Sequence, residues 1–406
     1  MRPLPLRISV VVAAILATLI PAQAAFAFTD VPTDYWDYTA IQYVASTHTW
    51  MQDYGTTLFQ PQTLETRSFL ARTLVTIYAP NEPPDPTITF IDLPPTDPFW
   101  PYANVAVKLG WMAKYKNGKW NGGGLVPTDA LDQALILAMG DFTDPIAGLA
   151  NIHEEDGTPY TFADRFPYQQ LARWLGFHFN HDDESQDLVS NTKMPRDEVA
   201  YSLWMATTIS QSTIDSTSVF DSIVLPDSTT TQHNFTQFAF DQVGFPYIWG
   251  GEWNAASPPG YCCGSQPIGG HDCSGFMWFV LKKNEDGYNA AQFHPLYVGW
   301  SLHERTSSEM AEFTPSHVTY ANLAIGNLMF FASDGGSSWE DVDHVGMYVG
   351  NGWMMHSTDG GPQLQWVGDG YYHDEFLWGR GLKSKSDAPR GPAHPLAGDR
   401  DVGHHR

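Results

Sequence analysis

Apolar residues recur three and four positions apart in the first half of the chain, as between residues 41 and 45. This spacing predicts short amphipathic helices. The helices belong to a loose repeat, because Phe-Thr-Asp at 28–30 returns as Phe-Ile-Asp at 90–92 and as Phe-Ala-Asp at 162–164. Each copy predicts a helix, a loop and a second helix. Two short helices cannot enclose a core, so neighbouring copies are expected to bury one another's apolar faces.

The second half of the chain has other patterns. Residues 276–281 are apolar almost all round, which predicts a buried helix that Asp272 caps. Between the two halves, residues 207–232 are rich in Ser, Thr and Asp, which is typical of a linker, with one short strand expected at 222–225. The polar tail at 384–406 is expected to be disordered.

Alternating apolar residues from 345 to 349 predict a half-buried strand, and the Gly-Asn-Gly that follows predicts a turn into a return strand. A three-residue loop at 350–352 would set residue 346 opposite His356, and so place His344 and His356 on the same face. A two-residue loop would place the two histidines on opposite faces. The register of this hairpin therefore decides whether they can act together.

The first 27 residues are expected to be an export signal. Two arginines precede an apolar run from Ile8 to Ile20, and a small-residue pattern follows at 25–27. The run is shorter than the roughly 20 residues that cross a bilayer, so no membrane span is expected. The signal predicts a secreted protein, and the length of 406 residues predicts two or three compact domains.

Charge and cysteine content limit the classes of partner and of chemistry that the chain can have. The formal net charge of -24 argues against nucleic acid as a partner. Three cysteines cannot all pair, and Cys273 is the candidate for a free, reactive thiol. Cys262 and Cys263 could form a disulfide, stay reduced or bind metal. Because no further cysteine completes a zinc site, a structural role is the default, and neither metal nor cofactor is expected.

Cys273 stands in the first turn of the predicted buried helix, where unpaired N–H groups and the helix dipole favour the thiolate. Most single cysteines are small core residues, which is the competing interpretation. His344 is the candidate general base, and His356 would fix its tautomer by binding the second ring nitrogen. His271 is a rival base, but it is too close to Cys273 along the chain to face it easily.

Four motifs, in this order, resemble the NlpC family of papain-like cell-wall endopeptidases. They are Gly-Phe-Pro-Tyr-Ile-Trp-Gly-Gly at 244–251, Asp-Cys-Ser-Gly-Phe at 272–276, Gly-Asn-Leu-Met-Phe-Phe at 326–331 and His-Val-Gly-Met-Tyr-Val-Gly at 344–350. The resemblance covers residues 233–383. It implies an α+β domain with an antiparallel sheet packed on the helix that bears the nucleophile. An insertion at 252–270 departs from the family.

The resemblance also implies roles for individual residues. Cys273 would attack an amide of the peptidoglycan stem peptide, His344 would move the proton and His356 would orient His344. The bond implied is the one from γ-D-glutamate to the diamino acid. Substrate-binding residues implied for a free amino-terminal L-Ala are Tyr247, Asp272 and Ser274.

The repeats at 28–80, 88–142 and, more weakly, 155–206 resemble S-layer homology repeats, which hold exported proteins on a secondary cell-wall polysaccharide. The resemblance implies that Arg67 and Arg196 contact this polymer, while Thr128-Asp129 reverses the charge. Arg67 could instead be a solvated residue paired with Glu65 or Asp53.

Together these features predict a multidomain protein in which an α-helical repeat region anchors a cysteine endopeptidase to the wall. Two alternatives stay open. The protein could be a structural or adhesive surface protein whose papain-like domain only binds glycopeptide. It could also use the same thiol as an acyltransferase or as an amidase at another bond.

Overall fold

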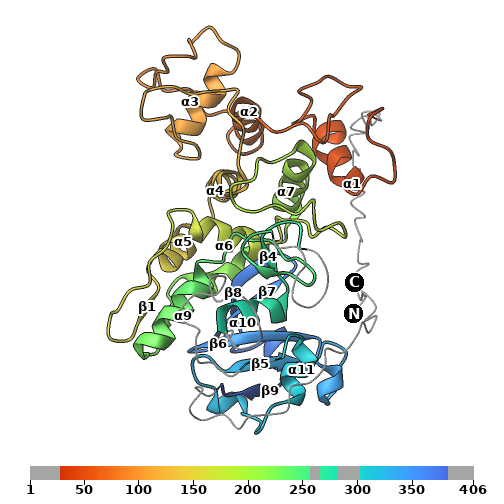
Figure 1. The fold of residues 1–406 in the computed structure, drawn as a ribbon. Helices are drawn as coiled ribbons and strands as arrows, with labels where there is room; N and C mark the ends of the chain where they lie inside the picture. Colours follow the sequence, from red (N-terminus) through yellow and green to blue (C-terminus); the bar gives the residue numbers. More distant parts are fainter. Residues whose placement is uncertain (1–27, 257–265, 282–301, 303, 383–406) are drawn as a thin grey trace, which may run out of the picture.

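The computed structural model describes residues 28–256, 266–281, 302 and 304–382. Helices gather in one half of the molecule, and a sheet with its covering helix forms the other half (Figure 1). Within the described ranges, no helix combines the length and apolarity that crossing a lipid bilayer requires. The predicted signal at 1–27, the tail at 384–406, and Cys262 and Cys263 lie outside the described residues.

The helical half contains three units of two helices each. The first helices are α1 (Tyr38–Ile41), which continues as the π-helical turn η1 (Gln42–Thr47), α3 (Trp100–Lys108) and α6 (Phe166–Trp174). The second helices are α2 (Arg67–Tyr78), α4 (Thr128–Met139) and α7 (Arg196–Thr208). Their apolar faces are buried in one continuous core, as the repeat pattern predicts.

The three units are closed by a ring of backbone hydrogen bonds. The N–H of Glu65 donates to the carbonyl of Met194 at 2.8 Å, that of Met194 to Val126 at 2.9 Å, and that of Val126 to Glu65 at 3.1 Å. Each residue stands two positions before the second helix of its unit. The units therefore surround one pseudo-threefold axis.

Units one and two also repeat a side-chain contact. The carboxylate of Asp30 accepts two backbone N–H groups of the loop before α2, and that of Asp92 accepts two before α4, at 2.7 to 2.9 Å. The recurring Phe-x-Asp pattern thus has a physical cause in these units. The aspartate fixes the loop that leads into the second helix.

The segment expected to be a linker is more regular than its composition predicts. It contains α8 (Gln211–Ser216), the 3-10 turn η2 (Thr217–Phe220) and β2 (Val224–Leu225), and α9 (Thr230–Phe240) begins inside it. Strand β2 pairs in parallel with β1 (His153–Glu154), which follows α5 (Thr143–Ala150). Phe220 is fully buried and stacks on Trp353 of the sheet, so this segment is packed between the two halves.

The sheet has five antiparallel strands in the order β8-β7-β6-β5-β9. They are β5 (Leu328–Phe331), β6 (His344–Gly350), β7 (Trp353–Thr358), β8 (Gly361–Trp366) and β9 (Phe376–Arg380). Helix α10 (Cys273–Leu281) packs on β6 and β7. The expected antiparallel sheet packed on the cysteine-bearing helix is confirmed.

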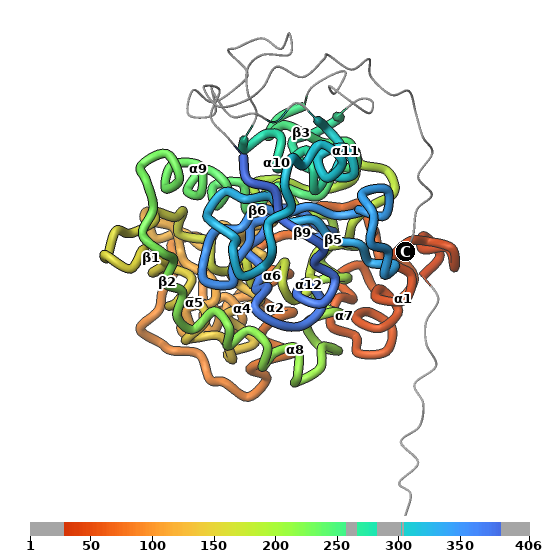
Figure 2. The backbone as a smooth tube through the Cα atoms, turned by 90° about the horizontal axis from the view of Figure 1, so that it is seen from below, coloured from red at the N-terminus to blue at the C-terminus, as the bar shows by residue number. Residues whose placement is uncertain are grey.

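Short elements surround this sheet. They are the antiparallel pair β3 (Glu252–Trp253) and β4 (Gly270–His271), the helices α11 (Ser307–Glu312) and α12 (Tyr371–Asp374), and the turns η5 (Tyr320–Asn322) and η6 (Trp339–Asp341). Seen from below, the sheet lies in front of the helical half (Figure 2). Helix α6 contacts the edge strand β8, so the two halves pack directly on each other.

The β6–β7 hairpin has the register that places the two histidines on one face, because Gly346 lies opposite His356. The turn itself consists of Asn351 and Gly352, with φ of 47° and 82°. A bulge precedes it at Gly350, whose φ is 108°. The predicted relationship is therefore right, but a two-residue turn plus one bulged residue produces it rather than a three-residue loop.

Candidate active site

Cys273 is the first residue of α10, and its side chain is almost completely buried. The preceding Asp272 accepts a hydrogen bond from the N–H of Gly275, as a capping residue does. Gly275 fits because a Cβ there would lie 2.0 Å from the carbonyl oxygen of Gly251. The glycine thus allows two backbone segments to meet directly behind the cysteine.

The thiol lies in a mixed environment. The backbone N–H groups of Val345 and Ser274 and the charge of Arg305 favour the thiolate. Burial, followed by the negative charge of Asp272, outweighs them and raises the pKa of Cys273 to about 12. The resting cysteine is therefore protonated at neutral pH, and its attack on a carbonyl requires a base.

The base candidates meet as predicted. Nε2 of His344 lies 2.8 Å from Nδ1 of His356, and their ring planes are nearly perpendicular at 82°. Val345, whose N–H reaches the Cys273 sulfur, directly follows His344. Nδ1 of His344 is thus the ring nitrogen left to serve the thiol.

Both imidazoles are neutral in the resting site. Burial lowers the pKa of His344 to about 4, although Asp343 raises it slightly. Burial and the neighbouring His344 lower the pKa of His356 well below its ordinary value. A neutral imidazole can accept a proton from a thiol, which is what general-base catalysis requires.

Asp272 and Ser274 both accept hydrogen bonds from an arginine that the sequence analysis did not identify. Arg305 is buried and binds Asp272 through two nitrogens, at 3.0 and 2.9 Å. It also donates to Ser274 Oγ at 2.8 Å and to Glu252 at 2.8 Å. The Arg305 guanidinium and the carboxyl groups of Asp272 and Glu252 are therefore paired next to the start of α10.

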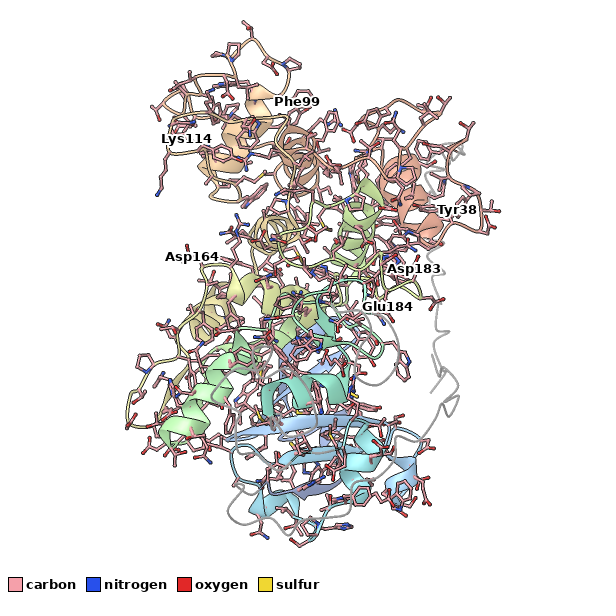
Figure 3. The ribbon with its side chains drawn as sticks, viewed as in Figure 1. Tyr38, Phe99, Lys114, Asp164, Asp183 and Glu184 are labelled. Atoms are coloured by element: carbon pink, nitrogen blue, oxygen red, sulfur yellow. The ribbon has the colours of Figure 1, made fainter. Side chains whose placement is uncertain are left out.

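Tyr247 lies within electrostatic reach of this group. Burial raises its pKa well above the ordinary value, and the neighbouring Cys273 and Asp272 raise it further. The next exposed residue, Trp249, donates its N–H to Glu184 at 2.9 Å. Glu184 belongs to the helical half and lies where that half meets the sheet domain (Figure 3). The helical half thus contacts the segment that carries Tyr247.

Tyr372 is a second residue that sequence reasoning missed. Its ring centroid lies 5.0 Å from that of His356 and 5.8 Å from that of His344. It comes from the short helix α12, which follows Gly370 at a φ of 73°. The adjacent His373 contacts Tyr320 instead and stands away from the site. No local pattern in the sequence marks Tyr372 as a neighbour of the two histidines.

His271, the rival base, is buried among the rings of Phe245, Phe276 and Phe279. Neither of its ring nitrogens has a hydrogen-bond partner among the described residues. Burial lowers its pKa to about 3, and Arg305 contributes to the shift. The structure places His271 in the apolar packing of the domain rather than beside His344.

In the repeats, Arg67 is half-buried and stacks on two aromatic rings. Its guanidinium carbon lies 4.4 Å from the ring centroid of Trp120 and 5.0 Å from that of Tyr115. It donates to the carbonyls of Trp120 and Ala113 at 3.1 and 2.7 Å. The alternative of a salt bridge to Glu65 or Asp53 is not what the structure shows, since Arg196 binds both.

Arg196 is fully buried, which counts against its predicted contact with a wall polymer. Its Nη1 donates to Asp53 at 2.6 Å and to Glu65 at 3.0 Å, and its other nitrogens donate to backbone carbonyls. A charged residue at the start of a helix had suggested that Arg196 is exposed to solvent. Asp53 and Glu65 lie more than 130 positions away in the sequence. By pairing with Arg196, they allow its charged side chain to be buried in the core.

The second repeat also needs a correction. The hydrogen-bonded ring shows that Thr128, not Asp129, occupies the place of Arg67 and Arg196. Thr128 is buried and donates to the carbonyl of Thr192 at 3.2 Å. Asp129 pairs with Arg165. Of the three equivalent positions, only that of Arg67 presents an accessible cation.

Comparison with known proteins finds similarity in the part of the chain that carries the candidate site. Residues 244–380 match the NlpC/P60 family. The gamma-D-glutamyl-L-lysine dipeptidyl-peptidase of Bacillus subtilis is 28% identical over 145 residues, which are 36% of this chain and 38% of that protein. The bifunctional muramidase/DL-endopeptidase CwlT of Bacillus subtilis is 31% identical over 136 residues, 33% of this chain and 31% of the relative.

The probable endopeptidase YafL of Escherichia coli is 28% identical over 155 residues, 36% of this chain and 50% of the relative. The chain thus spans half or less of the length of these relatives. A solved NlpC/P60 family protein from Bacillus cereus is 25% identical, covers 38% of this chain and 41% of its own, and has a TM-score of 0.27. The resemblance predicted for 233–383 is confirmed over the matched range: residues 244–380 of this chain form an NlpC/P60 domain.

Proposed function

We propose that this protein is an exported, wall-anchored peptidoglycan hydrolase that cleaves an amide bond of the stem peptide through Cys273. The observation that carries the proposal is the neutral His344–His356 pair, joined at 2.8 Å beside a cysteine at a helix start. Two of the relatives, named as a gamma-D-glutamyl-L-lysine dipeptidyl-peptidase and as a muramidase/DL-endopeptidase, support the substrate class.

In the proposed mechanism, His344 takes the thiol proton as the Cys273 sulfur bonds to the carbonyl carbon. The N–H of Cys273, at the helix start, stabilises the oxyanion. The carbon–nitrogen bond then breaks, and His344 returns the proton to the leaving amine. Water, deprotonated by His344, attacks the thioester and releases a carboxylate and the free thiol. His356 keeps the His344 ring oriented throughout.

The bond that we propose is the one from γ-D-glutamate to the diamino acid, because the name of one relative specifies this linkage. Tyr247 is proposed to contact the substrate near its amino end. Asp272 and Ser274 are bonded to Arg305, so we assign them to holding the start of α10 and thereby the nucleophile.

The helical units at residues 28–206 are proposed to be the anchor that binds a wall polysaccharide. The support is the half-buried Arg67 between two aromatic rings, since a guanidinium offers bidentate bonds to a carboxylate and rings offer a surface for sugar. Residues 1–27 are proposed to be the export signal.

The test is digestion of purified sacculi by the full chain, with products identified by mass spectrometry. The wild-type protein is expected to release stem-peptide fragments cut at the proposed bond, and Cys273→Ala is expected to release none while still binding walls. Cleavage by Cys273→Ala would contradict the mechanism. Absence of cleavage by the wild type, together with no iodoacetamide labelling of Cys273, would favour the alternative of a non-catalytic wall-binding protein.

A further inference from the structure

Gln363 stands at the far end of the histidine pair. It is on β8 directly opposite His356 of β7, and it is 6% exposed. Its amide nitrogen lies 3.4 Å from Nε2 of His356. Its amide oxygen is buried and has no hydrogen-bond partner among the described residues. A buried carbonyl oxygen without a donor is costly, which makes this contact unusual.

Proton positions in the pair are dictated by the chemistry at the thiol. For Nδ1 of His344 to accept the proton of Cys273, the other nitrogen of His344 must carry hydrogen. That Nε2–H faces Nδ1 of His356 at 2.8 Å, so Nδ1 must offer a lone pair. The proton of neutral His356 then sits on Nε2. This N–H points at the amide of Gln363 and requires an acceptor there.

The two ends of a glutamine amide have nearly the same shape, so the same space is filled when oxygen and nitrogen exchange places. With the oxygen toward His356, Gln363 accepts from Nε2–H and its unpartnered atom gains a donor. With the nitrogen toward His356, two N–H groups would face each other in the tautomer that catalysis needs.

We propose that Gln363 is a positioning residue of the active site, whose amide oxygen holds His356 in the Nε2–H tautomer and thereby leaves Nδ1 of His344 free as the base. The inference rests on the proposed function of Cys273. It extends the site to a chain of four side chains, Cys273, His344, His356 and Gln363, carried on α10, β6, β7 and β8.

An amide suits this place better than a carboxylate. The titratable groups that face the pair from the surrounding elements are Cys273 on α10, Asp343 before β6 and Tyr372 on α12. A carboxylate at 363 would favour a charged imidazole in this buried site. A neutral acceptor fixes the tautomer and leaves the imidazoles uncharged, which a general base requires.

The experiment compares Gln363→Leu, Gln363→Glu and the control Gln365→Leu in the full chain. Gln365 is on the same strand, and its amide donates to the adjacent carbonyl of Trp366. In Gln363→Leu, kcat is expected to fall by about tenfold to a thousandfold, with KM changed less than about twofold. Gln363→Glu keeps an acceptor, so it is expected to recover most of kcat and to move the acid limb of the pH profile upward. Wild-type kcat in Gln363→Leu, or equal loss in both variants, would overturn the proposal.

A second readout does not depend on activity. In histidine-labelled protein, nitrogen NMR is expected to show the proton of His356 on Nε2 in the wild type and redistributed in Gln363→Leu, with unchanged melting temperature as the folding control. A wild-type proton on Nδ1 would refute the role of Gln363 whether or not the protein cleaves peptidoglycan. Failure of cleavage alone, with the expected tautomer, would count only against the proposed function.

Discussion

Gln170 and Leu364 are joined by two hydrogen bonds although 194 residues separate them. The amide nitrogen of Gln170 donates to the carbonyl of Leu364 at 2.9 Å, and the N–H of Leu364 donates to the amide oxygen at 2.8 Å. Gln170 comes from helix α6 and is fully buried, and Leu364 lies on the edge strand β8. One side chain thus acts as a short neighbouring strand and covers an otherwise open sheet edge.

Replacing Gln170 with Leu is expected to lower the free energy of unfolding by about 2–4 kcal/mol, because two buried backbone groups lose their partners. Chemical denaturation measures this. The control is Gln186→Ala, an exposed glutamine with a local bond to Asp183, which should cost less than about 0.5 kcal/mol. Equal stability of Gln170→Leu and the wild type would show that the two halves do not depend on this contact.

Arg305→Ala is expected to lower the free energy of unfolding by about 3–5 kcal/mol, because the buried carboxylates of Asp272 and Glu252 would both lose the guanidinium that binds them. Arg305→Lys keeps the positive charge but not the planar guanidinium, so it should lose less stability than Arg305→Ala. Thermal and urea unfolding provide the measurement. Lys108→Ala removes an exposed pair with Glu82 and is expected to change stability by less than about 1 kcal/mol. A stable Arg305→Ala protein would contradict the role assigned to this ion pair.

The acid limb of kcat/KM is expected near pH 4 rather than near the ordinary histidine value. The base is active only as neutral imidazole, and burial lowers the pKa of His344 to about 4. Activity should therefore persist through pH 5 and fall as His344 takes up a proton below that. A rate profile on a soluble muropeptide tests this. An acid limb between pH 6 and 7 would indicate that water or substrate raises the pKa of the pair.

His271→Leu is expected to stabilise the protein. The substitution removes two buried nitrogens that have no hydrogen-bond partner in the part of the chain that the structure describes, which should raise the free energy of unfolding by about 1–2 kcal/mol at pH 7. Because the folded pKa of His271 is about 3, the unfolded chain binds a proton between about pH 6.5 and 3 that the folded chain does not. His271 therefore costs stability as pH falls, and the gain in the variant should grow by roughly 2 kcal/mol at pH 5.

Unfolding midpoints at pH 5 and 7 measure both parts of this prediction. A loss of stability in His271→Leu at both pH values would mean that the imidazole has a partner that the fold supplies only in solution.

Arg67→Ala is expected to weaken co-sedimentation with purified walls by about tenfold while leaving cleavage of soluble muropeptides unchanged. Lys114→Ala removes the same charge from an exposed neighbouring loop and should sediment like the wild type (Figure 3). Arg196→Ala is expected to unfold the units instead, since Asp53 and Glu65 would lose their shared partner. Normal sedimentation of Arg67→Ala would remove the support for an anchor at this position.

The hairpin histidines were predictable because strand alternation and the Gly-Asn-Gly turn are local signals. The bulge at Gly350 was not, since it depends on how the turn fits the strand twist. Arg305 carries no local mark either. Arg305 matters because it binds Asp272, which lies 33 positions earlier in the sequence. No periodic pattern between the two residues predicts this contact. The cysteine and the two histidines of the candidate site could thus be located from sequence motifs, while the residues that hold them in place could not.

Arg196 illustrates the opposite failure. A basic residue at the first position of a helix has every local sign of a solvated or binding residue. Asp53 and Glu65 pair with Arg196 only because the three units pack around one axis. Residue equivalence between the repeats was likewise misjudged by one position at Thr128, because the backbone ring rather than the side-chain identities defines it.

The ring through Glu65, Val126 and Met194 runs in one direction, because each segment donates a hydrogen bond to one neighbour and accepts one from the other. A protein missing any single unit would retain only one of these three bonds, with an unused donor on one survivor and an unused acceptor on the other. Pairs of units should therefore be poor folding intermediates, and the trio is expected to appear or disappear as a whole. A variant that lost one unit would therefore need new partners for the unused donor and for the unused acceptor at the same time.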